Sequence, residues 1–241
     1  MELCIFNKIE DDLCIKGILE KDNVIVLRNI IEFSETEGVT SSAIKEYVAT
    51  RLANDDNILS RLAQAGKFIG DDLYRLAKFD IEQIYKKLFS TQIKYAPSGN
   101  PIGFSNGYVA SIRAITESKL AQELLDLLIE HYRKFGSGIL AKYNAFRYDG
   151  ELIGVTNTDD ITFDSLVGIE YQKQVLIDNT KVFVSGKAAN NVLLFGDRGT
   201  GKSSSVKALL NMFCDDGLRI IEMPKHCINC LLYTSDAADD G

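Results

Sequence analysis

The stretch that decides the fold runs Asn191-Val-Leu-Leu-Phe-Gly-Asp-Arg-Gly-Thr-Gly-Lys-Ser-Ser204. Its central part, Gly196–Ser203, matches the pattern G-x-x-x-x-G-K-[ST] at every fixed position. The apolar run 191–195 before it is typical of a strand buried on both faces of a parallel sheet. A helix is predicted from Lys202 to about Phe213. A chance match to this pattern is expected in about one chain in a hundred of this size.

Each fixed position of this loop has a chemical reason. Glycines permit positive φ angles and a close approach of the backbone to a ligand. Consecutive N–H groups then surround an anion at the N-terminus of a helix, where the dipole also favours negative charge. Lys202 is expected to reach the β and γ phosphates of a nucleotide, and Ser203 to offer its hydroxyl to Mg²⁺. The predicted site consists of Gly196, Asp197, Arg198, Gly199, Thr200, Gly201, Lys202, Ser203 and Ser204.

The region around this loop alternates helices with strands. A helix is predicted over about 171–183 and another strand over 218–222, which together with the loop gives a βαβ unit and a parallel sheet. Asp149-Gly150, between two short apolar runs, indicates a two-residue hairpin turn. The predicted fold class is therefore α/β, an incomplete P-loop NTPase with flanking helices, preceded by a mostly α-helical N-terminal domain.

The first part of the chain has the apolar periodicity of helices. Apolar residues recur every four positions around residue 48, and a long helix is predicted from about Tyr108 to Phe135, ended by Gly136. Turn-forming residues predict a loop over 96–103. A second helical stripe contains Leu73, Leu76, Ala77, Ile81, Ile84 and Leu88.

Composition and charge predict a soluble protein of the cytoplasm. The 241 residues carry a net charge of −7, so the basic surface typical of duplex nucleic-acid binding is not expected. No apolar run reaches about eighteen residues, the length that a membrane span requires. The first residues do not resemble a signal peptide, and the five cysteines are interpreted as reduced thiols.

Several segments together resemble a bacterial family of AAA-type (AAA+) P-loop ATPases, known as a domain of unknown function. The resemblance covers about 145–226 and implies the N-terminal part of an ATPase domain over 143–226, behind a helical domain over 1–142. It implies ATP and Mg²⁺ as cofactors, although these residues do not separate ATP from GTP. The segments are Leu166-Val-Gly-Ile-Glu-Tyr-Gln-Lys173, Asn179-Thr180, Ala189–Ser204 and Leu218-Arg-Ile-Ile-Glu222.

The resemblance also indicates where the base and a neighbouring subunit would lie. In such ATPases the segment matching Leu166-Val167-Gly168 packs beside the adenine, which makes Val167 and Gly168 candidates for the base pocket. An apolar turn between a strand and a helix explains these two residues equally well. Arg198 is expected to point to solvent rather than to a partner subunit.

The family pattern stops after His226. The resemblance implies that an apolar strand ending in paired acids should follow, and later sensor residues and an arginine finger. No apolar strand leads into Asp239 and Asp240, so no catalytic residue is assigned. The last residues resemble a translated sequencing adapter, and 227–241 are expected to be an artefactual tail on a fragment.

Two further features are not expected to carry chemistry. Cys227 and Cys230 form a CxxC pair, but no second pair accompanies them, and His226 alone does not complete a tetrahedral zinc site. His131 lies in a leucine-rich helical stretch and is expected to be a surface or packed helix residue rather than a catalyst.

Three functions remain open. The first is an AAA-type machine, in its complete form a candidate homo-oligomer, that couples ATP hydrolysis to remodelling or loading of a protein or nucleic-acid partner. The second is an ATP-dependent switch with little turnover, and the third is a P-loop kinase. The Leu166-Val167-Gly168 block favours the AAA-type reading over the kinase. The chain as it stands is expected to bind nucleotide weakly and to hydrolyse none.

Overall fold

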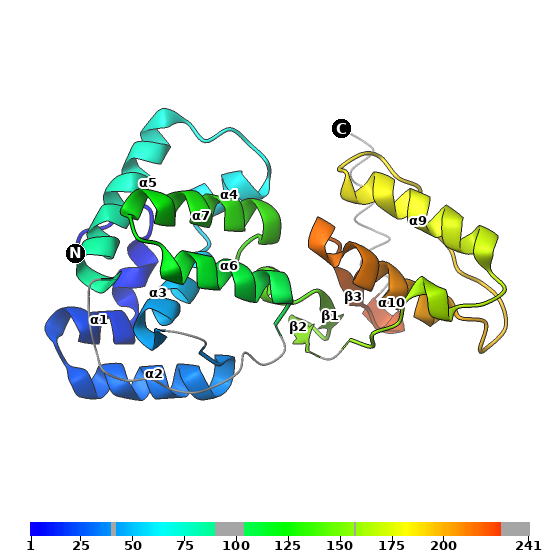
Figure 1. Ribbon diagram of the computed structural model, residues 1–241, viewed down its shortest axis with the longest axis horizontal. Coiled ribbons are helices and arrows are strands. Elements are labelled where there is room, and N and C mark those ends of the chain that lie inside the picture. The colour runs from blue at the N-terminus through cyan, green and yellow to red at the C-terminus, as the bar shows by residue number, and fades with distance from the viewer. Residues whose placement is uncertain (40–41, 90–103, 157, 228–241) are drawn as a thin grey trace. The chain divides into compact units, whose positions relative to one another are not determined.

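A computed structural model of the chain describes residues 1–39, 42–89, 104–156 and 158–227. The fold is mixed α/β and mostly helical, with one small sheet among the described residues (Figure 1). The chain divides into two compact units, Met1–Lys142 and Tyr143–Gly241. Among the described helices, none combines the length and apolar character that crossing a bilayer requires.

The first unit is helical throughout its described part. Its residues bury one continuous apolar core, in which Phe6, Leu52 and Tyr132 are among the largest fully buried side chains. A 3-10 helix at Asn7–Asp11 comes first, and a π-helical turn at Tyr85–Phe89 extends α5. The α-helices are α1 Leu13–Glu20, α2 Asn23–Glu37, α3 Ala43–Ala53, α4 Ile58–Gln64, α5 Asp71–Ile84, α6 Asn106–Glu117, α7 Ala121–Phe135 and α8 Ile139–Lys142.

Side-chain caps determine where several of these helices begin. Asp12 accepts a hydrogen bond from the Ile15 N–H at the start of α1 (3.1 Å), and Asp22 does the same for α2. At the start of α4, Asn57 and Ser60 bond each other's backbone N–H groups in a capping box. These caps satisfy N–H groups that the first turn of a helix leaves without partners.

The single long helix expected over 108–135 is wrong. Ser118 has an extended backbone and ends α6, and the Lys119 N–H donates to the Glu123 carboxylate (2.7 Å) just before α7. The apolar periodicity continues across this break, which is why periodicity alone did not reveal it. Gly136 does end α7, with a φ of 79°. The loop expected at 96–103 lies outside the described residues.

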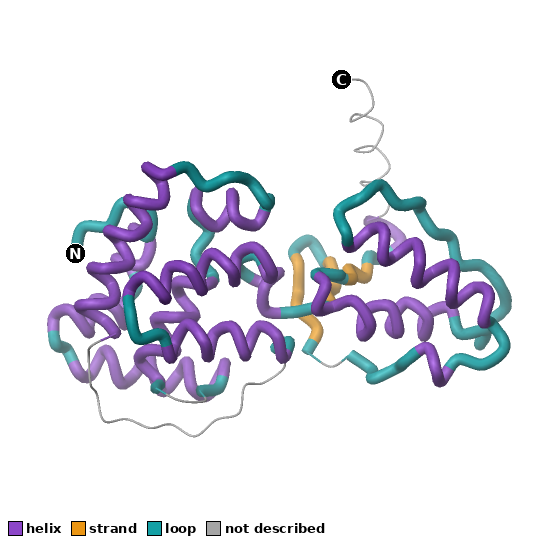
Figure 2. The backbone as a smooth tube through the Cα atoms, turned by 45° about the horizontal axis from the view of Figure 1, so that its top comes forward, coloured by secondary structure: helices purple, strands orange, loops and turns teal. Residues whose placement is uncertain are grey.

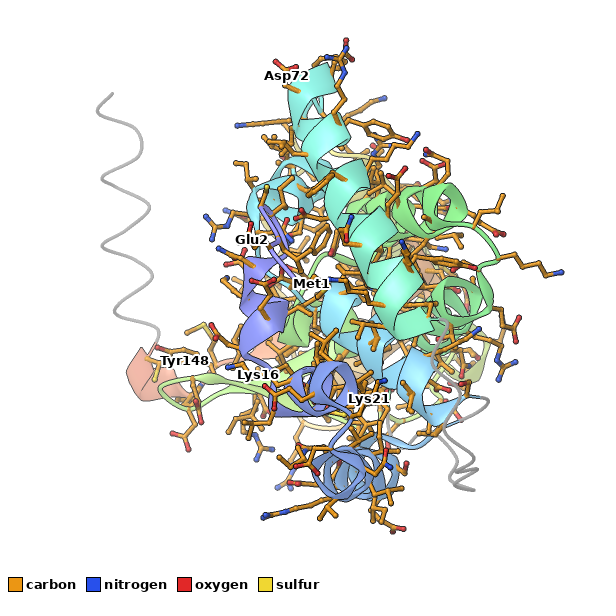
Figure 3. The ribbon with its side chains drawn as sticks, turned by 90° about the vertical axis from the view of Figure 1, so that its left-hand side faces the viewer. Met1, Glu2, Lys16, Lys21, Asp72 and Tyr148 are labelled. Carbon is orange, nitrogen blue, oxygen red and sulfur yellow. The ribbon has the colours of Figure 1, made fainter. Side chains whose placement is uncertain are left out.

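A buried carboxylate attaches the N-terminal segment to α5. Asp80 is fully buried, and its two oxygens accept the Cys4 N–H at 2.9 Å each. One of these oxygens also accepts the N–H groups of Ile5 (2.6 Å) and Phe6 (3.1 Å). Figure 3 shows the preceding residues Met1 and Glu2 beside this helix. A charge without solvent thus receives several donors, as a buried carboxylate requires.

His131 lies on α7, and its side chain is buried in the first unit, with 1% of its surface exposed. Its Nδ1 lies 2.9 Å from the Ser111 hydroxyl, and Nε2 has no partner among the described residues. The rings of Tyr108, Tyr132 and Phe135 surround it at 5.3–6.0 Å between centroids. Burial lowers the pKa of this imidazole from 6.5 to about 4, because the charged form loses its hydration.

The second unit places two helices beside a three-stranded sheet (Figure 2). Strand β1 (Ala145–Tyr148) pairs antiparallel with β2 (Leu152–Val155) and parallel with β3 (Ile220–Glu222). The helices are α9 (Glu170–Val184) and α10 (Lys202–Phe213), with 3-10 turns at Phe163–Ser165, Cys214–Asp216 and Lys225–Cys227. The buried apolar residues are Ala145, Phe146, Phe163, Leu176, Ala208, Leu210 and Phe213.

Three expectations for this unit are met in outline. The helix expected from Lys202 to about Phe213 has those bounds, and the strand and helix expected at 218–222 and 171–183 correspond to β3 and α9. The hairpin exists, but three residues rather than two separate its strands. Only β1 and β3 are parallel, so the expected parallel sheet is one pair with an antiparallel third strand.

The strand expected at 191–195 is wrong. This segment has no strand partner among the described residues. Leu193 is 83% and Phe195 87% exposed, although both were expected to be buried. The physical reason is that β3 pairs with β1 and not with the segment 191–195. Val192 and Ile220 of β3 both line one groove, but no strand pairing joins them.

Replacing Asp80 by Asn is expected to lower the free energy of unfolding of the first unit by about 2–4 kcal/mol. The reason is that buried N–H groups lose part of their charged acceptor. Urea denaturation followed by circular dichroism measures this loss. Glu82→Gln, an exposed position on the same helix, should change stability by less than about 0.5 kcal/mol. Equal effects of the two substitutions would contradict the role given to Asp80.

Burial of His131 predicts a decline of stability in acid. The unfolded chain takes up a proton near pH 6.5, whereas the folded chain resists it until about pH 4. Stability from this group is therefore complete above pH 6.5 and falls as the pH is lowered towards 4, by about 3 kcal/mol in total. Denaturation of the wild type and of His131→Gln across this range isolates the contribution. Parallel pH profiles for the two proteins would rule it out.

Candidate functional site

The glycine-rich loop Gly196–Gly201 leads directly into α10 (Figure 1). Its three glycines all have positive φ: 139° at Gly196, 87° at Gly199 and 82° at Gly201. Gly201 is the residue immediately before the helix and has a left-handed conformation. The spacing of glycines in the sequence therefore corresponds to the positions at which the backbone takes angles that other residues avoid.

Lys202 folds back over the loop. Its ammonium donates to the carbonyl oxygens of Gly196 (2.8 Å) and Asp197 (2.6 Å), and to the Thr200 hydroxyl oxygen (3.1 Å). That hydroxyl in turn donates to the Asp197 carbonyl oxygen (2.9 Å). The first residue of the helix is thus bonded to the first residue of the loop, and the loop becomes a closed ring.

The N–H groups of this ring are available to a ligand. Among the described residues, no hydrogen bond has its backbone donor between Gly196 and Ser204. Three of these donors, on Lys202, Ser203 and Ser204, belong to the first turn of α10, where N–H groups have no partner within the helix. Free donors at a helix N-terminus form a site for an anion.

The other predicted loop residues lie at the surface. Asp197, Arg198 and Ser203 are exposed, and Ser204 is half-buried. The Arg198 side chain makes no ion pair among the residues that the structure describes. Ser203 stands in the first helical turn, one residue after Lys202.

Side-chain hydrogen bonds hold the surroundings of the loop to α10. The Ser205 hydroxyl, almost fully buried, donates to the Gly201 carbonyl oxygen (2.9 Å). Further along the helix, the Asn211 amide donates to the carbonyl oxygens of Asp159 and Ile161, both at 2.9 Å. Lys207 forms an ion pair with the Asp159 carboxylate. These bonds keep the segment before residue 163 against the helix that carries the candidate site.

The segment 166–169 reaches the loop through Leu166 and Ile169. A β-carbon added to Gly201 would lie 3.8 Å from Leu166 Cδ2 and 4.0 Å from Ile169 Cδ1. Val167 is 89% exposed, and Gly168 has a φ of 85° that turns the chain between the two apolar residues. Sequence reasoning missed Leu166 and Ile169, although their spacing around a glycine was the available signal.

Asn179 attaches the entry segment of the loop to α9. Its side-chain amide donates to the Asn190 carbonyl oxygen (2.9 Å), and its side-chain oxygen accepts the Asn190 N–H (3.0 Å). A groove of about 300 Å³ lies alongside, between α9, the segment 189–192 and α10. The glycine-rich loop does not line this groove. The loop is therefore an open surface site.

No cluster of three or more histidine, cysteine or acidic side chains is arranged to hold a metal ion within the described residues. Cys227 is half-buried at the end of the described chain, and Cys230 lies beyond it. The Ser203 hydroxyl lies on an exposed residue in the first turn of α10.

Comparison with known proteins gives one match. Residues 141–237 match the family described as "Protein of unknown function (DUF815)". This part of the chain therefore contains a domain of unknown function, and it includes the glycine-rich loop and both of its supporting helices. Searches of the curated proteins and of the solved structures found no match.

Replacing Gly201 by Ala is expected to destabilise the loop and the start of α10. The added methyl group has room, at 3.8 Å from Leu166, but the residue must hold a φ of 82°. Backbone strain of this kind costs about 1–2 kcal/mol. Amide hydrogen exchange in the peptide that covers α10 measures this destabilisation, and it should be faster in Gly201→Ala than in the wild type. Gly70→Ala is the control, because Gly70 has a φ of −67° and open space around it. Unchanged exchange in Gly201→Ala would show that the loop is not strained.

Proposed function

We propose that residues Gly196–Ser204 bind the phosphate groups of ATP together with Mg²⁺, in a P-loop ATPase domain of the AAA type. The observation that carries this proposal is the closed ring of the loop. Three glycines at positive φ, a lysine bonded across the ring and a row of free N–H groups come together at the N-terminus of one helix. Neutral ligands would gain little from such a site, whereas phosphate oxygens fit it.

Different loop residues would contact the phosphate groups of ATP and the Mg²⁺ ion. The N–H groups from Gly199 to Ser204 would surround the phosphate oxygens, and the Lys202 ammonium, already placed over the ring, would neutralise charge on the β and γ phosphates. The Ser203 hydroxyl would be a ligand of Mg²⁺, which supplies further positive charge between the phosphates when it is bound.

The base would lie against the segment 166–169. Leu166 and Ile169 provide apolar side chains next to Gly201, and the turn at Val167 and Gly168 continues that surface. Apolar contact of this kind suits the face of a purine ring without selecting its edge. ATP is proposed because the segment also carries the resemblance to AAA-type ATPases, and the comparison with GTP belongs to the test.

For the 241 residues themselves, the proposal is binding rather than turnover. In an AAA-type ATPase, hydrolysis requires paired acids at the end of an apolar strand, and we assign no such pair here. For an ATPase domain of this type, the proposed role is to couple ATP hydrolysis to the remodelling or loading of a protein or nucleic-acid partner, as a homo-oligomer.

Replacement of Lys202 by Met is expected to weaken ATP binding at least tenfold. The loss of one charge-assisted contact, about 1.5–3 kcal/mol, corresponds to a factor of ten or more. Titration with a fluorescent ATP analogue, competed by ATP, GTP or AMP, measures the affinities. The wild type should prefer ATP to AMP, and Lys202→Met should lose this preference. In Ser203→Ala the stimulation of binding by Mg²⁺ should decrease.

Lys181→Met serves as the control for this experiment, since Lys181 is exposed on α9 and the substitution removes the same charge. It should leave both the affinity and the preference for ATP unchanged. Equal affinity of the two variants, or wild-type affinity for ATP no higher than for AMP, would refute phosphate binding by the loop. A clear preference for GTP would retain the loop's role and change the nucleotide.

A further inference from the structure

The helical unit carries a groove of about 480 Å³ that the nucleotide proposal does not use. It lies between the connection that precedes α5 and one side of α7. Phe68 and Ile69 line it from the connection, Tyr74 from α5, and Asp126, Ile129 and Glu130 from α7. Figure 3 marks this end of α5 by the label on Asp72.

An aromatic ring stands uncovered at the edge of this groove. Phe68 is 85% exposed, the largest exposure of any phenylalanine in the helical unit's described part. Single exposed apolar residues are common on protein surfaces, but here Ile69 and Tyr74 continue the apolar surface into the groove, and Ile129 is its buried base. A ligand would therefore meet a ring face and an apolar base together.

A carboxylate from α7 is held in place in the lining of this groove. One oxygen of Asp126 accepts hydrogen bonds from the Tyr74 hydroxyl (3.1 Å) and from the Gln122 amide (3.1 Å), and its second oxygen lies 3.2 Å from the same amide. Gln122 also donates to the Tyr74 hydroxyl. Both partners are neutral, and no lysine or arginine forms an ion pair with Asp126 among the described residues. The carboxylate is therefore oriented by hydrogen bonds alone.

A second carboxylate adds negative charge beside Asp126 in the groove. Glu130 follows Asp126 by one helical turn, so the two carboxylates share one side of α7. Arg133 also lines the groove, but it makes no ion pair with either carboxylate in the described part of the chain. The groove thus combines two carboxylates, which outnumber its one arginine, with an exposed aromatic ring.

We propose that this groove docks a segment of a partner protein that presents an arginine flanked by apolar residues. The planar guanidinium suits a carboxylate with a fixed orientation, and its face stacks on an aromatic ring. The apolar neighbours of the arginine occupy the surface formed by Ile69 and Ile129. A nucleic acid does not fit, because Asp126 and Glu130 would repel its phosphates.

The test uses the full 241-residue chain and two labelled peptides. One peptide is Gly-Ser-Leu-Arg-Leu-Ser-Gly, and the other replaces its arginine by citrulline, which keeps the shape and removes the charge. Fluorescence anisotropy should show that the wild type binds the arginine peptide at least tenfold more tightly. Asp126→Asn should abolish that preference, and Phe68→Ala should weaken binding of both peptides.

Glu35→Gln, at an exposed position on α2, removes the same charge elsewhere and should retain the preference. Circular dichroism confirms that each variant is folded. Absence of saturable binding, or equal loss of preference in Asp126→Asn and Glu35→Gln, would overturn the proposal. So would self-association in sedimentation that Asp126→Asn disrupts, because the occupant would then be a second copy of the chain. Nucleotide binding by the loop is unaffected by any of these results.

Discussion

The bonds from the Lys202 ammonium to the carbonyl oxygens of Gly196 and Asp197 are the constraint on which the candidate site depends. They join the two ends of the loop. Positive φ angles at its three glycines allow the backbone to close in this way. The lysine is consequently a structural member of the loop as well as a source of charge.

The supports of this ring come from separate places. Asn179 fixes the entry through the backbone of Asn190, and Ser205 fixes the exit through the Gly201 carbonyl oxygen. Leu166 and Ile169 pack near the same glycine. The loop is therefore positioned by α9, by α10 and by the turn before α9, without a strand at 191–195. The immediate support of the loop is therefore a helix N-terminus and side-chain hydrogen bonds.

The features that the sequence predicted correctly are those with local causes. Glycine positions, the bounds of α10 and the end of α7 at Gly136 follow from backbone preferences of single residues. The strand at 191–195 was not of this kind, because a strand exists only through hydrogen bonds to a neighbour, and β3 pairs elsewhere. Likewise the break between α6 and α7 depends on the non-helical backbone of Ser118 and Leu120, which the apolar pattern does not reveal.

Polar contacts between residues far apart in the sequence could not be predicted from the sequence. Asp80 meets the N-H groups of residues more than seventy positions away, and a periodicity argument identifies only that α5 has a polar residue on its apolar side. The same holds for Asp126, whose orientation depends on Tyr74 from another helix. A polar residue acquires its role from the partners that the fold supplies. Asp80 is fully buried among backbone donors and anchors the N-terminal segment, whereas Asp126 is bonded to side chains at the surface and remains accessible to a ligand.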